Sequence, residues 1–178
     1  MKEEASDHRS QIALRFAAGE DVGLILNFIR RLAAYERMSN EVVADEKLLR
    51  KTLFGERRFA EVVIASYDGE PAGFALFFHN FSTFLGRPGI YLEDLFVDPE
   101  MRGRGIGRAL LSFLAGLAVE RGCGRLEWAV LDWNVDAIGF YERLGARAMD
   151  EWTTFRIAGE ALQDLAKNAI SGPEGWES

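Results

Sequence analysis

The chain has 178 residues, of which 48% are hydrophobic, 12% aromatic and 28% charged, and its formal net charge at pH 7 is −7. This length and composition predict one soluble globular domain with a substantial core. The acidic balance disfavours nucleic acid or an anionic membrane surface as the main partner, because both attract a basic face. The longest apolar run, residues 110–119, is too short to cross a membrane.

Two features of the chain predict a cytoplasmic protein. The first eleven residues are polar and lack the apolar run of a secretory signal, and the single Cys123 has no partner for an internal disulfide. We interpret Cys123 as a small buried hydrophobe rather than a nucleophile. Residues 1–10 are expected to form a disordered arm and residues 169–178 an unstructured tail, with one domain at 11–168 between them.

Hydrophobic periodicity predicts alternating strands and helices along this domain. Apolar residues that alternate indicate strands, and apolar residues at three- and four-residue steps indicate helices with one apolar face. In chain order, these patterns predict a strand at 11–17, helices at 22–35 and 45–53, strands at 59–67, 72–81 and 89–97, a helix from 106, a strand at 125–131, a helix at 134–144, an interrupted β-forming segment at 146–157, and a last helix at 160–168.

The strongest functional pattern is the turn between the strand at 89–97 and the helix that follows it. The turn contains three glycines within five residues, Gly103, Gly105 and Gly107, together with Arg102 and Arg104, and Arg108 follows directly. Glycines let the backbone approach a ligand closely, and the N–H groups at a helix N-terminus attract an anion. We therefore predict a phosphate-binding turn at residues 102–107.

Residue spacing distinguishes between kinds of phosphate site. A P-loop would continue with Lys and Ser or Thr after its last glycine, but Arg108 and Ala109 follow Gly107, so this interpretation fails. A dinucleotide site needs G-x-G-x-x-G and an acid after the next strand. The glycines here follow G-x-G-x-G, although Asp132 at the end of the next strand keeps the dinucleotide alternative open.

The turn resembles the pyrophosphate loop of the GCN5-related N-acetyltransferase (GNAT) family. Arg102, Gly105 and Gly107 meet the family motif R/Q-x-x-G-x-G/A, and residues 97–103 meet the preceding V-x-P-x-x-R-G. The resemblance covers roughly residues 11–166 and implies an α/β (α+β) acyl-CoA N-acyltransferase fold. In that fold, helices cover both faces of a mixed, mostly antiparallel sheet that splays into a V between two strands, here at 89–97 and 125–131.

Other segments resemble one subfamily, the diamine (spermidine/spermine) acetyltransferases. They are LAAYE at 32–36, YLED at 91–94, and LDWN at 131–134 with Phe140-Tyr141. The runs AVLDWN and FSTFLGR look more like the thialysine N-epsilon-acetyltransferase branch. Polyamine enzymes tend to have Asp-Pro-Trp where this chain has Ser82-Thr83-Phe84, and the missing acid weakens the case for spermidine and spermine.

The resemblance implies direct acetyl transfer from acetyl-CoA to an amine in a ternary complex. Glu93, which shares a strand face with Tyr91 and Leu95, would assist deprotonation of the amine through water. Tyr141 would protonate the CoA sulfur, since a phenol is protonated at neutral pH. From the residues alone, Glu93 could be a sheet carboxylate satisfied by its neighbours and Tyr141 a core residue. For Asp94, on the other strand face, we favour such a structural role.

The resemblance also implies which residues bind the two substrates. A bulged strand would hydrogen-bond the pantetheine arm through its backbone, the turn would bind the pyrophosphate, and Asn134 would both cap a helix and contact pantetheine. The implied cofactor-binding residues are Leu95, Phe96, Val97, Arg102, Gly103, Arg104, Gly105, Ile106, Gly107, Arg108, Asn134, Ala137 and Tyr141. The implied substrate-binding residues are Tyr35, Glu36, Glu93, Glu127, Trp128, Ala129 and Glu151, with Asp150 as an alternative to Glu151.

The predicted function is acetyl-CoA-dependent N-acetylation of a small cationic amine: a diamine, a polyamine, or a lysine analogue such as thialysine. Two alternatives remain open, namely acetylation of a protein N-terminus or lysine and CoA binding by a sensor without turnover. The resemblance implies a homodimer that completes each site. No metal is expected, because His79 has no second His or Cys nearby in the sequence.

Overall fold

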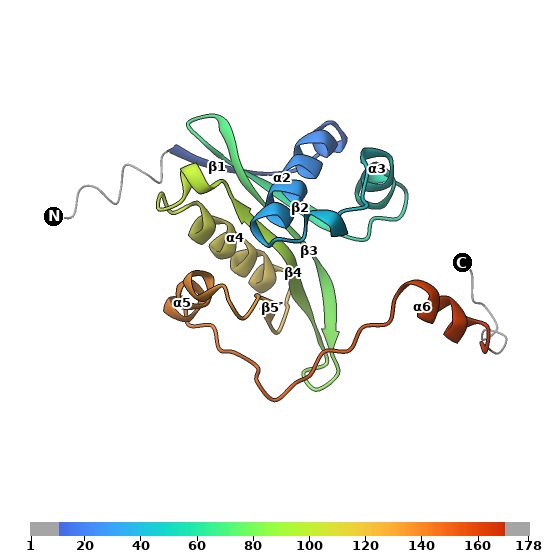
Figure 1. The fold of residues 1–178 in the computed structure, drawn as a ribbon. Helices are drawn as coiled ribbons and strands as arrows, with labels where there is room; N and C mark the ends of the chain where they lie inside the picture. The colour runs from blue at the N-terminus through green and yellow to red at the C-terminus, as the bar shows by residue number, and fades with distance from the viewer. Residues whose placement is uncertain (1–10, 170–178) are drawn as a thin grey trace. The chain divides into compact units, whose positions relative to one another are not determined.

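The computed structural model describes residues 11–169, so the predicted arm at 1–10 and nearly all of the predicted tail lie outside the described residues. The chain divides into two compact units, residues 1–129 and 130–178, which are described separately (Figure 1). The first unit contains β1 (Ile12–Phe16), η1 (Gly19–Asp21), α2 (Val22–Tyr35), η2 (Ser39–Glu41), α3 (Glu46–Phe54), β2 (Glu61–Tyr67), β3 (Glu70–Ser82), β4 (Arg87–Val97), η3 (Pro99–Met101), α4 (Ile106–Glu120) and β5 (Leu126–Trp128).

The five strands form one sheet in the order β1-β2-β3-β4-β5. The first four strands pair antiparallel, and β5 pairs parallel to β4. The predicted mixed, mostly antiparallel sheet is therefore confirmed. The strand predicted at 125–131 is shorter than expected, because only Leu126–Trp128 pair with β4.

Apolar side chains on both faces of the sheet are buried, since helices cover both faces. On one face, α2 and α3 enclose a core in which the ring of Phe28 lies 5.5 Å from that of Phe74 and 5.7 Å from that of Phe96. On the opposite face of the sheet, strand residues such as Val63 and Phe77 are also fully buried. The long helix α4 contacts all five strands. Burial on both faces explains why β2 and β3 read as nearly continuous apolar runs.

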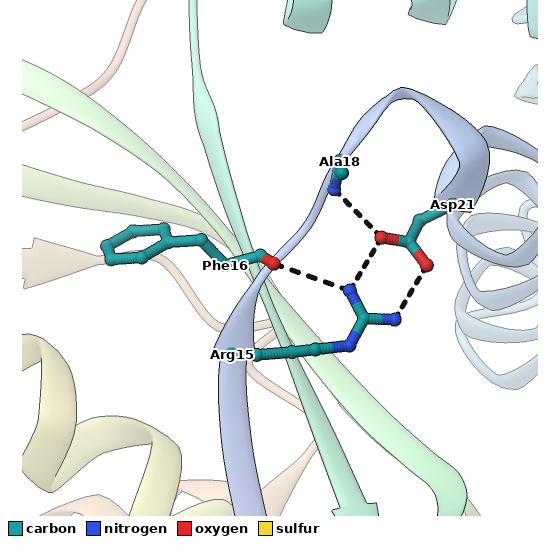
Figure 2. A network of polar contacts seen from close by, with 4 residues as sticks. All are labelled: Arg15, Phe16, Ala18 and Asp21. Atoms are coloured by element: carbon teal, nitrogen blue, oxygen red, sulfur yellow. Dashed lines mark hydrogen bonds and ion pairs between the residues drawn. The ribbon is translucent and has the colours of Figure 1, made fainter.

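A bidentate ion pair joins the end of β1 to the start of α2 (Figure 2). Arg15 donates from Nη1 and Nη2 to the two carboxylate oxygens of Asp21, each at 2.7 Å, and the backbone N–H of Ala18 donates to Asp21 at 2.8 Å. The Arg15 guanidinium holds the pKa of Asp21 below its ordinary value. Asp21 is buried, so the pair satisfies a carboxylate that burial would otherwise destabilise.

The second unit contains α5 (Val135–Arg143) and α6 (Gly159–Ala166), which confirms the two predicted helices. The prediction of β structure at 146–157 is wrong, because the structure has no strand there. Asp150 and Glu151 interrupt the alternating pattern, and a strand also needs a neighbour to pair its backbone groups. In the described part of this unit, no second strand lies where it could pair with residues 146–157.

Candidate active site

The turn after β4 has the backbone conformation of an anion-binding loop. Gly103 and Gly105 have φ angles of +78° and +84°, and Gly105 is the N-cap of α4. Glycine is required there by conformation, since a Cβ on Gly103 would meet no atom within 4 Å. Gly105 has no side chain that could cap the helix, so the N–H groups of the first turn of α4, which form the positive end of the helix dipole, can bind an anion. This arrangement fits a diphosphate.

Two arginines of this turn stack on aromatic rings of neighbouring elements. The guanidinium of Arg102 lies 4.5 Å from the ring centroid of Tyr35 at the end of α2, and Arg104 lies 4.9 Å from that of Tyr67 in β2. Arg102 also donates from Nε to the backbone oxygen of Val97 at 3.3 Å. These contacts place exposed positive charge around the N-terminus of α4.

Strand β4 has an open edge next to this turn. Within residues 11–169, it pairs with β5 only over Ile90–Leu92, and from there to Val97 it pairs with β3 alone. This is the predicted splay of the sheet, and the open edge includes residues 95–97, the predicted pantetheine-binding residues. An open strand edge can hydrogen-bond an extended molecule that carries amide groups.

A β-bulge lies in β4 at Glu93. Leu76 of β3 pairs with Asp94, whereas the next residue, Phe77, pairs with Leu92, so Glu93 has no opposite residue. Glu93 is exposed, while Asp94 is partly buried. The bulge lies one residue beyond the last β4–β5 pair, so Glu93 is an exposed residue at the mouth of the splay, the point where β4 and β5 separate.

Three carboxylates lie near one another at the junction of α2 and β4. Burial and the negative charges of Glu93 and Glu36 raise the pKa of Asp94 to about 6, and burial raises the pKa of Glu36 at the C-terminus of α2. The neighbours that shift the pKa of Asp94 are anionic, so a cation would be stabilised at this junction. The structural role expected for Asp94 stays a prediction.

Ionisation of Asp94 should therefore destabilise the fold. Its pKa rises from 3.8 to about 6 on folding, so the native state binds this proton more tightly and loses stability as the pH rises across that interval. Each pKa unit corresponds to 1.36 kcal/mol, so Asp94→Asn should raise the free energy of unfolding by up to about 3 kcal/mol at pH 8 and little at pH 4. Urea unfolding at both pH values measures this, and an equal effect at both would contradict it.

One of the predicted substrate residues around β5, Glu127, contacts other polar side chains of the sheet. Glu127 forms an ion pair with Arg125 at 2.7 Å and accepts a hydrogen bond from Asn80 at 2.8 Å. Trp128 is the last residue of the strand and Ala129 follows it. The structure thus places Glu127 in a polar network between β3 and β5 rather than in the carboxylate group at α2 and β4.

The second unit holds the remaining predicted residues. Asn134 caps α5 by accepting from the backbone N–H of Ala137 at 3.4 Å, as predicted from the sequence. Tyr141 lies in the last turns of α5, with its ring 5.4 Å from that of Phe140. Glu151, the predicted substrate residue, is exposed in a segment without regular structure.

The residues that the structure describes offer neither a metal site nor a membrane segment. Among residues 11–169, no three or more His, Cys, Asp or Glu side chains are grouped so that they could hold a metal ion. Within the same range, every helix is too short or too polar to cross a bilayer.

Comparison with known proteins agrees with the fold. The model of the GNAT acetyltransferase family matches residues 29–146. A thialysine N-epsilon-acetyltransferase of Sus scrofa is 41% identical, over 88% of this chain and 98% of its own. An L-ornithine N5-acetyltransferase of Arabidopsis thaliana is 35% identical over 90% of each chain. Among solved structures, an integron cassette protein from V. cholerae has a TM-score of 0.75 at 27% identity, over 89% of this chain and 99% of its own.

The fold and the matches define an acetyl-CoA-dependent N-acetyltransferase. The chain belongs to the GNAT family, and its relatives include thialysine N-epsilon-acetyltransferases at about 40% identity over most of its length. The resemblance predicted from the turn and the YLED and LDWN segments is thereby confirmed, and the dinucleotide alternative is excluded.

Two features of the site were not predicted from the sequence. The first is the raised pKa of Asp94, which depends on Glu36 of α2 and could be found only once the two elements were placed together. The second is an ion pair between Arg31 and Asp98, which are separated by 67 residues. No local pattern in the sequence signals either contact.

Proposed function

We propose that this enzyme acetylates the primary amine of a small cationic substrate, in the chemical class of thialysine and ornithine. The observation that carries the proposal is the group of carboxylates formed by Glu36, Glu93 and Asp94, in which the negative neighbours of Asp94 and its burial raise its pKa. An ammonium group bound there would relieve the repulsion and gain Coulomb energy in a partly dehydrated site. Tyr35, next to Glu36, would form part of the same wall.

The described residues fit acetyl-CoA as the acyl donor. The glycine turn, with Arg102, Arg104 and Arg108, would bind the pyrophosphate through backbone N–H groups and positive charge. The open edge at 95–97 would pair with the pantetheine amides. Asn134, Ala137 and Tyr141 are the contacts proposed for the second unit.

The proposed chemistry needs one proton acceptor and one proton donor. Acetyl-CoA, when bound, supplies an acetyl group activated as a thioester. Glu93 would accept, through a water molecule, the proton that the ammonium group must lose before its nitrogen can attack, and would pass it to solvent. The neutral amine then bonds to the acetyl carbon, and its second proton leaves to solvent as the amide forms. Tyr141 would donate its phenolic proton to the sulfur as the carbon–sulfur bond breaks. The reaction consumes the amine and acetyl-CoA and forms one amide and one CoA thiol, and Tyr141 regains its proton from solvent.

The substrate class can be tested by measuring release of free CoA from acetyl-CoA against thialysine, ornithine, putrescine, spermidine and a lysine-containing peptide. We expect saturable turnover with thialysine or ornithine and a lower kcat/KM with spermidine. Turnover confined to the peptide would favour protein acetylation, and CoA binding without any turnover would favour a sensor.

A homodimer, implied by the family, belongs to the same proposal and is measured by light scattering after size-exclusion chromatography.

A further inference from the structure

The junction between α2 and the pyrophosphate loop is held by a bidentate ion pair. Arg31 donates from Nη1 and Nη2 to the two carboxylate oxygens of Asp98, each at 2.8 Å. Asp98 is the residue at which β4 ends and the loop begins, and its side chain is only 17% exposed. The pair lowers the pKa of Asp98, so both groups are charged across the physiological range.

Asp98 forms hydrogen bonds with three segments of the chain, namely α2, η3 and β3. Its carboxylate also accepts from the N–H of Glu100, which caps η3, and its own N–H donates to the backbone oxygen of Ala72 in β3 at 2.9 Å. Arg31 therefore binds a carboxylate that is already tied to the sheet and to the first turn of the loop. A bidentate charged pair between such fixed groups has little freedom to rearrange.

Arg31 lies one turn before the C-terminal end of α2, where Tyr35 and Glu36 form the proposed amine-binding end of the helix. Its guanidinium also lies 5.4 Å from the ring centroid of Phe96 in β4. Tyr35 is four residues further along the helix, and its ring is the one on which Arg102 of the loop stacks at 4.5 Å. The last turn of α2 and the loop are thus joined at two points, an ion pair and a stacked arginine.

We infer that Arg31 and Asp98 are positioning residues, which hold the pyrophosphate loop and the amine-binding end of α2 in one arrangement. This inference rests on the proposed function, because it assigns CoA to the loop and the amine to Glu36 and its neighbours. Neither side chain needs to touch a substrate. Loss of the pair should weaken binding of both substrates, since each site is built on one side of the junction.

The chain offers a matched control for this inference. Arg15 and Asp21 form a second bidentate pair (Figure 2). This pair joins β1 to the N-cap of α2, whereas Arg31 lies near the C-terminal end of this helix of 14 residues. Loss of this second pair removes a comparable interaction without touching the loop. Arg31→Gln and Asp98→Asn can therefore be compared with Arg15→Gln, and Arg31→Lys retains the charge while it loses the planar fork.

The experiment measures the Kd of CoA by calorimetry, the KM of the preferred amine and the Tm for each variant of the full chain. We expect Arg31→Gln and Asp98→Asn each to raise the Kd about 5- to 20-fold and to raise the KM of the amine, with the double variant close to the singles because the pair acts as a unit. Arg31→Lys should fall between Arg31→Gln and the parent. Arg15→Gln should lower the Tm but leave the Kd within about twofold.

Unchanged CoA affinity in both Arg31→Gln and Asp98→Asn, with a loss of Tm like that of Arg15→Gln, would overturn the inference and leave a purely structural pair. A double variant whose Kd is the product of the two single effects would also overturn it, because independent residues do not form a positioning pair. An unmodified protein that binds no CoA would instead overturn the proposed function itself.

Discussion

Replacement of Tyr141 by Phe is expected to lower kcat about 10²- to 10³-fold with the preferred amine, while the KM of acetyl-CoA changes by less than about threefold. The substitution removes the phenolic hydroxyl, whose proton is proposed for transfer to sulfur. The ring that contacts Phe140 remains, and so does the Asn134 cap of α5, so the helix should keep its stability. Steady-state kinetics between pH 6 and 10 measure the effect.

A matched control for this loss of a hydroxyl is Tyr67→Phe. The hydroxyl of Tyr67, at the end of β2, donates a hydrogen bond to Oε1 of Gln11 at 2.5 Å, and the variant keeps the ring on which Arg104 stacks. Its kcat should stay within about twofold of the parent, because this hydroxyl has no role in the proposed proton transfer. A Tyr141→Phe enzyme as fast as the parent would exclude Tyr141 as the proton donor.

Replacement of Glu93 by Gln is expected to lower kcat/KM for the amine about 10²-fold at pH 7.5. The bulge leaves Glu93 exposed at the mouth of the splay, where a water molecule can reach both the carboxylate and a bound amine. Gln keeps the size of the side chain but cannot accept the proton. Rates within about threefold of the parent from pH 6 to 9 would contradict this role.

Asp94→Asn tests whether Asp94 acts differently from Glu93, by binding the cationic amine rather than by accepting its proton. The pKa of Asp94 is raised to about 6, so its negative charge appears as the pH rises through this value and should then favour binding of a cationic amine. The parent should therefore show a rise in kcat/KM near pH 6 that Asp94→Asn lacks, with a smaller loss at pH 7.5 than Glu93→Gln. Retention of the rise in Asp94→Asn would assign it to another group.

The parts of the fold that the sequence predicts are those governed by local rules. The bounds of α2 and the start of α4 follow from apolar residues at helical spacing. The turn before α4 follows from its glycines, of which Gly103 and Gly105 have positive φ angles, while Gly107 already lies in α4. The cap at Asn134 is equally local. These features require no knowledge of the rest of the chain.

The parts that could not be predicted depend on contacts between distant segments. A bulge at Glu93 adds one residue to β4 relative to β3, and no residue in YLEDLFV marks it. The field around Asp94 depends on Glu36, and Asp98 meets an arginine 67 residues away. The prediction for 146–157 failed for the same reason, because a strand exists only where a second strand pairs with it.

The most direct test of the central claim, that the turn after Met101 binds the diphosphate of CoA, is a calorimetric titration of the protein and of Gly105→Val with CoA. Gly105 has a φ of +84°, which a β-branched residue adopts only with strain. We predict one saturable site in the parent and at least about a tenfold weaker Kd in the variant, since the N–H groups that would hold the diphosphate depend on this backbone. No heat with the parent protein, or equal affinity in Gly105→Val, would contradict the claim.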